Sequence, residues 1–282
     1  MASALPGNRQ HEIGGVSDAP EPATAVAVRL KGRAAALCRC YYYPLVDSTN
    51  IRVGEMAEDG APEGTVVLAD GQSRGKGQTG REFFSPAGAG LYLSVLLRSI
   101  PPPAGMPLIT VAAAAAVSLA IEDVCAIRTQ IKWVNDIYLA DKKICGILAE
   151  GSFYHETPER DYVVLGVGIN LFRPPAGFPS ELSGVAGWLY EQAPERDVRG
   201  ALAAGILNRF FTFFPNLTDR AFLAEYRRRS NILGRSVLCL EGERYYPARA
   251  LDIDPDGGLA VDLEDGSRRI LRSGEVRVRP LM

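Results

Sequence analysis

The stretch Asp70–Pro86 reads DGQSRGKGQTGREFFSP, and it decides which fold the rest of the chain supports. Its Gly75, Gly77 and Gly80 formally satisfy the G-x-G-x-x-G pattern of dinucleotide-binding domains. Those domains need a helix directly after the glycines, whereas an aromatic pair, a proline and then a strand-like segment follow here. We therefore predict a loop between two strands and disfavour a nicotinamide-dependent enzyme.

This loop has the composition of a segment that folds over an anion. Arg74, Lys76 and Arg81 bring three cations into eight residues, and no acidic residue lies between positions 71 and 81. Glycines let backbone N–H groups approach oxygen atoms closely, and successive amides can form an anion-binding nest. The alternative is an exposed, solvated loop, which leaves this composition unexplained. The chain has no G-x-x-x-x-G-K-[ST] motif, so a P-loop nucleotidase is disfavoured.

Strand and helix signals interleave on both sides of the loop. Strands are expected at Thr65–Asp70, Leu91–Arg98, Thr129–Val134, Ile144–Glu150 and Tyr162–Asn170. Helices are expected at Ile51–Glu58, Pro107–Cys125, Val198–Phe214 and Asp219–Arg229. Several neighbouring strands are joined by segments too short for a helical crossover. This pattern predicts an α/β (α+β) fold with a mixed β-sheet and packed helices.

We expect three parts along the chain. Residues 1–24 are polar and contain proline and glycine, which is typical of a disordered tail. Residues 25–232 carry the mixed sheet. Residues 235–282 contain five short strand candidates separated by turn signals such as Asp256-Gly257-Gly258, which predicts a small β-barrel.

Composition argues against several classes of protein. A net charge of −2 and a pI of about 5.9 leave no overall electrostatic footprint for nucleic acid. The N-terminal residues lack the apolar run of a secretory signal, and the apolar stretch Leu108–Ile121 is too short to span a bilayer. Five cysteines without C-x-x-C spacing indicate reduced, mostly buried thiols, so we expect a cytoplasmic protein without a protein-held metal. The two histidines, His11 and His155, lie in polar segments, which disfavours histidine-dependent catalysis.

Two segments suggest ligand contacts and have structural alternatives. Asp47–Asn50 (DSTN) precedes a helix, where it is either a plain N-cap or a group of polar side chains for a heterocycle. The glycines of Gly166–Asn170 (GVGIN) lie in a strand, where they mark either the close approach of a ligand or tight packing against a neighbouring element.

Lys132 is a cation within an otherwise apolar strand. Strand alternation places Lys132 and Val134 on the face opposite Trp133. A cation in such a place needs an anionic partner, and a ligand phosphate or carboxylate would serve. The following Asn135-Asp136 either belongs to the same site or is only a hairpin turn.

Taken in order, these motifs resemble the biotin protein ligase family. The resemblance rests on DSTN, on Gln72 with the loop GKGQTGR, and on FSP, LYLSVLLR, KWVNDIYL, KKICGILAE and LGVGIN. It is close over about residues 41–170 and looser toward the C-terminus, where SGEVRVR is similar to the family's final strand. It implies a catalytic domain like those of class II synthetases and lipoate ligases, followed by an SH3-like barrel.

The resemblance also implies a ligase that works in two steps, with biotin and ATP as substrates. The carboxylate of biotin attacks the α-phosphate of ATP and gives biotinyl-5′-AMP and pyrophosphate. The ε-amine of a specific lysine on a biotin carboxyl carrier domain, such as that of acetyl-CoA carboxylase, then attacks the mixed anhydride and releases AMP. Mg²⁺ would offset the charge of the phosphates.

The implied site residues follow from the matching positions. Implied biotin contacts come from Ser48, Thr49, Asn50, Gln72, Gly75, Lys76, Gly77, Gln78, Lys132, Gly166 and Gly168. Implied nucleotide contacts come from Lys76, Arg81, Trp133, Asn135, Lys143, Asn170 and Arg279. Lys132 is the implied catalytic residue, because it would stabilise the charge that develops on the reacting carboxylate and phosphate.

The Gly-rich loop departs from the family pattern, which usually reads G-R-G-R-x-G-R. Lys76 keeps the charge of arginine but lacks its bidentate fork, and Gln78 lacks the charge as well. Arginine at the position of Gln78 helps family members to retain the adenylate. We therefore hypothesise weaker retention here unless Arg74 or Arg81 compensates. Phe83 stands where tryptophan is usual.

Other interpretations stay open at this point. A lipoate or other acyl-adenylate ligase shares the architecture, and a non-catalytic biotin-binding or carrier-binding module is the alternative outside enzymes. The segment before the motifs is too short for a helix-turn-helix, so we expect no repressor function and no nucleic-acid or membrane partner. We expect a monomer or a weak homodimer. The C-terminal arginines form either a solvated face or a surface that steers an acidic carrier domain or the nucleotide.

Overall fold

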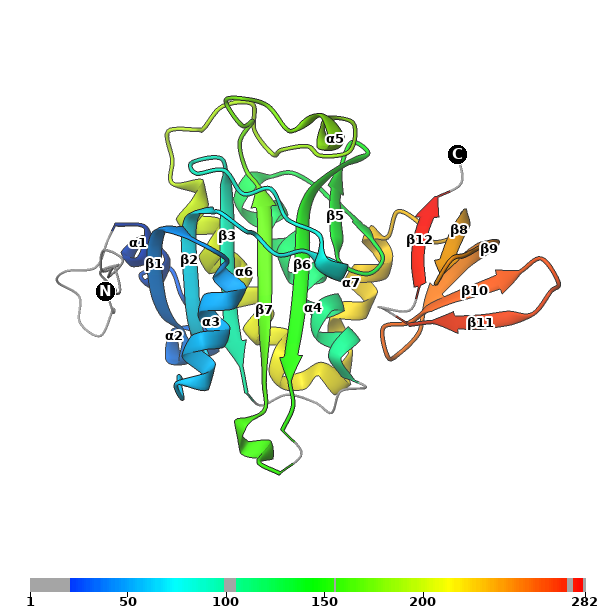
Figure 1. The fold of residues 1–282 in the computed structure, drawn as a ribbon, viewed down its shortest axis with the longest axis horizontal. Coiled ribbons are helices and arrows are strands. Elements are labelled where there is room, and N and C mark those ends of the chain that lie inside the picture. The colour runs from blue at the N-terminus through cyan, green and yellow to red at the C-terminus, as the bar shows by residue number, and fades with distance from the viewer. Residues whose placement is uncertain (1–20, 99–104, 155, 273–275, 281–282) are drawn as a thin grey trace, which may run out of the picture.

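The computed structural model of the protein describes residues 21–98, 105–154, 156–272 and 276–280. A seven-stranded sheet forms its centre, with helices on both faces and a smaller sheet beside it (Figure 1). The strands of the large sheet are β1 (Arg39–Val46), β2 (Thr65–Gln72), β3 (Gly90–Leu97), β4 (Gln130–Lys132), β5 (Asp136–Leu139), β6 (Lys142–Ser152) and β7 (Tyr162–Asn170). They follow the order β1-β2-β3-β7-β6-β5-β4. Only β1 and β2 pair in parallel, so the expected mixed sheet is confirmed.

Helix α3 (Thr49–Glu58) is the crossover that the parallel β1–β2 pair requires. It covers one face of the sheet, in front of β2 and β3 in Figure 1. A small apolar core fills the space beneath it, with Val53 and Ala57 packed against Val67 and Leu96. The predicted helix at Ile51–Glu58 is thus confirmed and begins two residues earlier.

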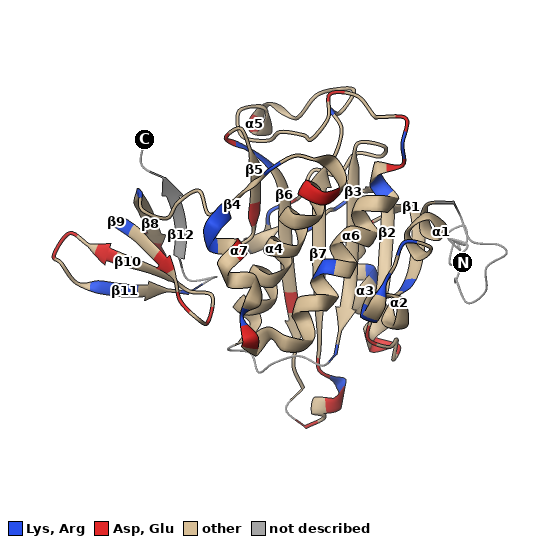
Figure 2. Ribbon diagram, turned by 180° about the vertical axis from the view of Figure 1, so that it is seen from behind, with Lys and Arg blue, Asp and Glu red and all other residues tan. Residues whose placement is uncertain are grey.

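The opposite face of the sheet is covered by the other helices (Figure 2). They are α1 (Glu21–Ala27), α2 (Gly32–Leu37), α4 (Met106–Cys125), α6 (Val198–Phe213) and α7 (Ala221–Arg229). Two short helices, α5 (Ser180–Ser183) and the 3-10 helix η4 (Phe214–Asp219), lie between the longer elements in the chain. Most of the apolar core lies between these helices and the sheet.

Helix α4 is the central helix of that layer. It is long and apolar enough to cross a membrane, but 72% of its most apolar window is buried inside the protein. Its run Ala112–Ala116 is 0–2% exposed throughout, so small side chains face both the sheet and α6. The predicted buried helix is confirmed.

The C-terminal part forms a five-stranded antiparallel sheet, the arrangement predicted for the small barrel. Its strands are β8 (Ser236–Glu241), β9 (Arg244–Ile253), β10 (Leu259–Leu263), β11 (Arg268–Leu271) and β12 (Val276–Pro280), in the order β11-β10-β9-β8-β12. Acidic and basic residues lie side by side on it (Figure 2). Arg268, Arg269 and Arg272 pair with Asp262, Glu241 and Asp254 at 3.0, 3.1 and 2.9 Å. These pairings favour the solvated-face interpretation for the described arginines.

Several features differ from the expectations. Strand β1 was not predicted, and it contains Pro44, which an edge strand tolerates because it lacks one pairing partner. Strand β5, only four residues long, was also missed. Helix α1 begins at Glu21, so the last residues of the predicted tail are helical, and Ala23 is fully buried. The rest of that predicted tail lies outside the described residues.

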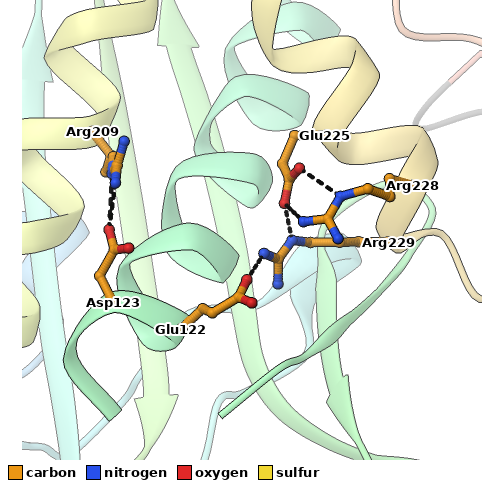
Figure 3. A network of polar contacts seen from close by, with 6 residues as sticks. All are labelled: Glu122, Asp123, Arg209, Glu225, Arg228 and Arg229. Carbon is orange, nitrogen blue, oxygen red and sulfur yellow. Dashed lines mark hydrogen bonds and ion pairs between the residues drawn. The ribbon is translucent and has the colours of Figure 1, made fainter. Parts of the chain in front are cut away.

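Ion pairs join α4 to α6 and α7, the helices that pack on it (Figure 3). The side chain of Arg229 is 0% exposed and lies between Glu122 of α4 and Glu225 of α7. Glu225 also accepts a hydrogen bond from Arg228, which is the main reason why the pKa of Glu225 is lowered. Because a buried guanidinium needs anionic partners, this network constrains how α7 approaches α4.

We expect Arg229→Met to lower the free energy of unfolding by about 3 kcal/mol, because it leaves two carboxylates without their buried partner. The matched control is Arg209→Met. Arg209 pairs with Asp123 at 2.6 Å with both side chains nearly half exposed, so the loss should stay below about 1 kcal/mol. Urea unfolding of the two variants measures the difference, and equal losses would contradict the prediction.

Acidification should weaken the same network. The pKa of Glu225 lies below its ordinary value of 4.5 in the folded protein. Its stabilising contribution is therefore complete above about pH 4.5 and is lost as the pH falls through the lower folded-state pKa.

Candidate active site

The start of helix α3 turns its polar side chains toward the sheet. Thr49 and Asn50 are 4% and 6% exposed. The backbone N–H and the hydroxyl of Thr49 both donate to Gln72 Oε1, at 2.8 and 3.1 Å. Ser48 occupies the N-cap position, but its side chain makes no capping hydrogen bond. A plain N-cap therefore does not explain these residues.

Ser94 on β3 completes this polar cluster, and the sequence analysis missed it. Its side chain is 0% exposed, and its Oγ lies 2.7 Å from Thr49 Oγ1 and 2.5 Å from Asn50 Oδ1. The available signal was a hydroxyl residue in the middle of the apolar strand LYLSVLL. A buried hydroxyl in such a strand needs a polar partner, and helix α3 supplies two.

Gln72 connects the polar cluster to the Gly-rich loop. Its Nε2 donates to Ser85 Oγ at 2.8 Å, and Ser85 Oγ donates to the carbonyl of Phe83 at 2.8 Å. A role for Ser85, the serine of the FSP motif, was not predicted. Through these two hydrogen bonds, Ser85 joins the end of the loop to the polar cluster.

The Gly-rich loop folds as a small hairpin. Phe83 N–H donates to the carbonyl of Gly75 and Gly77 N–H to that of Arg81, both at 2.7 Å, and the 3-10 turn η1 (Gln78–Gly80) forms the tip. The hairpin therefore uses two of the amides expected to form an anion-binding nest. Gly75 is needed because a Cβ there would lie 2.4 Å from the Phe83 carbonyl, and Gly80 because its φ is +72°.

Glycines on β6 and β7 make room for groups that line the site. Gly146 and Gly168 face each other across these strands, and a Cβ on Gly168 would lie 2.7 Å from the ring of Phe83. A Cβ on Gly166 would lie 2.0 Å from Asn50 Oδ1. Gly166 and Gly168 are therefore glycines because Asn50 and Phe83, which both line the same cleft, pack closely against them.

The segment after Lys132 is a tight hairpin between β4 and β5. Lys132 pairs with Asp136 across the two strands, and Lys132 Nζ lies 5.7 Å from the centre of the Tyr138 ring. Asn135 Nδ2 donates to the carbonyl of Ile147 at 2.7 Å, and Lys143 Nζ lies 2.6 Å from Asp136 Oδ1. The turn is confirmed, and the assignment of Asn135 and Asp136 to a ligand site stays a prediction, which their place beside Lys132 supports.

Trp133 and Val134 lie behind this hairpin. Trp133 is 6% exposed, its indole N–H donates to the carbonyl of Gly257 in the small C-terminal sheet at 3.0 Å, and it does not line the cleft formed by the described residues. The structure therefore gives Trp133 a contact with the C-terminal sheet, and its expected nucleotide contact stays a prediction. Val134 is buried too, and its carbonyl accepts from Tyr226 Oη at 3.0 Å. The predicted alternation fails at Val134 because the strand already ends at Lys132.

These elements enclose a cleft of about 640 Å³, a size suited to a small-molecule ligand. Of the expected site residues, its lining includes Ser48, Thr49, Asn50, Gln72, Lys76, Gly77, Gln78, Arg81, Lys132, Asn135, Lys143, Gly166, Gly168 and Asn170. Gly75 lines the neighbouring cavity instead. Arg279 belongs to β12, and its side chain lies outside what the structure describes.

The cleft is cationic although the chain as a whole has a charge of −2. Four of its lining side chains are lysine or arginine, and two are acidic, Glu82 and Asp136. Positive charge concentrated in a concave site attracts anionic ligands. This local excess agrees with the expectation of a carboxylate or phosphate ligand.

An apolar lip on the cleft was not predicted. It is formed by Phe178, Leu182, Val185 and Ala186. The ring of Phe178 packs against Phe84 of the FSP motif at 6.1 Å and stacks on Trp188 at 5.8 Å. The one signal in the sequence was a group of aromatic and apolar residues within a segment rich in proline and glycine.

The site offers no nucleophilic thiol. The five cysteines are buried and unpaired, as expected, and burial raises the pKa of Cys40 to about 12. Among the described residues, no group of three or more histidine, cysteine or acidic side chains could hold a metal ion. Its described groups can act by orienting substrates and stabilising charge.

Comparison with known proteins identifies the class to which this fold and site belong. Residues 42–170 match the model of the biotin/lipoate A/B protein ligase family, and residues 232–279 match the biotin protein ligase C-terminal domain. A bifunctional ligase/repressor of Bacillus subtilis is 34% identical over 81% of this chain and 71% of its own length. A biotin–[acetyl-CoA-carboxylase] ligase of Mycobacterium tuberculosis is 30% identical over 81% and 85%.

A solved structure agrees with these matches. The biotin protein ligase of Aquifex aeolicus, in complex with biotin and ATP, superimposes with a TM-score of 0.70 and 28% identity, over 86% of this chain and 99% of that one. The chain belongs to the biotin protein ligase family.

We expect Trp133→Phe to lower the free energy of unfolding by about 1–3 kcal/mol, because the buried Gly257 carbonyl loses its donor. Trp188→Phe is the matched control: it keeps the aromatic stacking on Phe178 and should change stability by less than about 0.5 kcal/mol. Urea unfolding followed by circular dichroism provides the comparison. An unchanged Trp133→Phe variant would show that the contact between the domains contributes nothing.

Proposed function

We propose that the protein forms biotinyl-5′-AMP from biotin and ATP and transfers the biotin to a lysine of a carboxylase carrier domain. The observation that carries this proposal is the single cleft that combines the polar cluster beneath α3 with Lys132 and its neighbouring cations. Such a cleft matches a ligand with a polar ring at one end and an anion at the other.

The polar cluster suits the ureido ring of biotin, which presents N–H donors and a carbonyl acceptor. Ser48 and Thr49 offer hydroxyls, and Asn50 and Gln72 offer amides with both donors and acceptors. Thr49 is bonded to Gln72, and Ser94 is bonded to both Thr49 and Asn50, so these side chains are held in fixed orientations. Pre-ordering of this kind lowers the entropic cost of binding.

The first step brings two anions together, so its chief requirement is positive charge. A carboxylate oxygen forms a bond to the α-phosphorus, and the bond to the pyrophosphate oxygen breaks. Lys132, Lys76, Arg81 and Lys143 would stabilise the charge on the carboxylate, the α-phosphate and the leaving group. Lys132 is the proposed catalytic residue, because it brings a positive charge into the cleft at the end of β4.

For the nucleotide, we propose contacts from Asn135 and Asn170, with the apolar lip as a surface for the base. Asn170 Nδ2 donates to the carbonyl of Gly187, which joins the lip to β7. Mg²⁺ usually binds through one or two carboxylates plus substrate phosphates. Asp136 lines the cleft beside Lys143 and is the carboxylate proposed for this role; bound Mg²⁺ would offset phosphate charge.

In the second step, the carrier lysine's amine attacks the acyl carbon, and AMP departs with the electrons of the broken anhydride bond. The positive cleft then holds the phosphate of AMP as it leaves. We propose this ligase activity alone, in the cytoplasm. In the part of the chain that the structure describes, the short helices α1 and α2 precede the large sheet and pack on α6.

The deciding experiment measures pyrophosphate release from ATP and Mg²⁺ with either biotin or lipoate, followed by transfer to a carrier domain. We expect biotin-dependent release and labelled carrier. Lys132→Met should reduce the rate by about 10²–10³, whereas Lys142→Met, whose ammonium contacts the carbonyl of Gly184 outside the cleft, should stay near wild type. Release with lipoate alone would make the protein a lipoate ligase, and no release with either acid would favour a binding module.

Gln78, which stands where the family usually has arginine, gives a second test. Gln78→Arg should slow the dissociation of biotinyl-adenylate by about tenfold, because a charged bidentate donor is added at the cleft. Gln78→Lys, which adds charge without the fork, should have a smaller effect. An unchanged dissociation rate for Gln78→Arg would contradict the hypothesis that Gln78 weakens retention of the adenylate.

A further inference from the structure

A single carboxylate joins the Gly-rich loop to helix α3. Lys76 Nζ lies 2.5 Å from Oε1 of Glu150, a residue of β6. The other oxygen, Oε2, accepts a hydrogen bond of 2.8 Å from Asn50 Nδ2. One oxygen of Glu150 therefore contacts the loop, and the other contacts the helix that carries the polar cluster.

The Lys76–Glu150 ion pair lies where two cavities meet. A second cavity of about 660 Å³ is bounded by the Gly-rich loop, by Met106 and Pro107 at the start of α4, and by β6. Lys76 lines both this cavity and the binding cleft. Within the described chain, Glu150 lines only the second cavity. The ammonium group of Lys76 is thus at the border of the cleft and is paired with a group on the side of the second cavity.

We propose that Glu150 is a positioning residue that competes with the anionic group of the ligand for Lys76. The inference rests on the proposed function, in which a carboxylate and then an acyl phosphate enter the cleft beside Lys76. The two side chains are 41% and 37% exposed, and a pair this accessible is weak enough to be exchanged. Glu150 thereby holds the loop against α3 before the ligand arrives and lowers the affinity for the adenylate afterwards.

The two contacts of Glu150 can be separated by substitution. The hydrogen bond from Asn50 needs only an acceptor oxygen, which glutamine retains. The ion pair with Lys76 needs the negative charge, which glutamine lacks. Glu150→Gln therefore removes the competition for Lys76 and keeps the contact with α3.

The test follows the release of biotinyl-adenylate formed on the enzyme from labelled biotin and ATP and chased with an excess of unlabelled substrates. We expect Glu150→Gln to slow release about threefold, the size expected of an exposed ion pair. Glu55→Gln, which makes the same charge change at an exposed pair with Arg52 on α3, should leave the rate unchanged. Release from Glu150→Gln that is as fast as wild type, or faster, would overturn the proposal.

A double-mutant cycle shows whether Glu150 acts through Lys76. In a Lys76→Met background, Glu150→Gln should no longer change the rate of release. If the slowing persists there, Glu150 acts through general repulsion of the ligand, and the proposal is wrong. Pyrophosphate release by the wild type is measured first. If the wild type releases no pyrophosphate, the proposed function is wrong. If it releases pyrophosphate normally and Glu150→Gln releases the adenylate at the wild-type rate, only the proposal about Glu150 is wrong.

Discussion

The structure of the site depends on one physical constraint: the hydroxyl and amide groups buried beneath helix α3 must all find hydrogen-bond partners. Thr49 and Asn50 meet this requirement by binding Ser94 from β3, and they extend the chain of contacts to Gln72 on one side and Glu150 on the other. At each end, this series of hydrogen bonds reaches the Gly-rich loop: Gln72 bonds to Ser85, and Glu150 bonds to Lys76. The recognition cluster and the loop are therefore parts of one hydrogen-bonded circuit.

The glycines of the site serve mainly to provide space. Gly75 lets the loop close on Phe83, and Gly146 and Gly168 admit the Phe83 ring over the sheet. Gly166 leaves room for Asn50. Cationic side chains then supply the chemistry at the border of this tightly packed region. The same geometry explains how a protein with a net negative charge presents a cleft suited to carboxylates and phosphates.

Local patterns in the sequence predicted most of the architecture, because apolar alternation and helical periodicity are properties of neighbouring residues. The strands around LYLSVLL and YVVLGVGIN and the alanine-rich helix were predicted on this basis. The motifs predicted most of the cleft lining. What the sequence could not indicate were contacts between residues far apart in the chain: Ser94 with α3, Glu150 with Lys76, and the apolar lip at Phe178. The hydrogen bond of Trp133 to Gly257, 124 positions away, could not be predicted for the same reason.

That distant partner has a consequence for biosynthesis. The turn after Lys132 is supported from behind by Tyr226 and by Gly257, which the ribosome adds long after the sheet itself. Domains generally fold as units, beginning with the N-terminal part. A nascent chain that has not yet reached Gly257 can form the large sheet but lacks one of the two supports of its active-site hairpin. The active-site hairpin therefore gains its second support only after the C-terminal sheet has been synthesised and has packed against it.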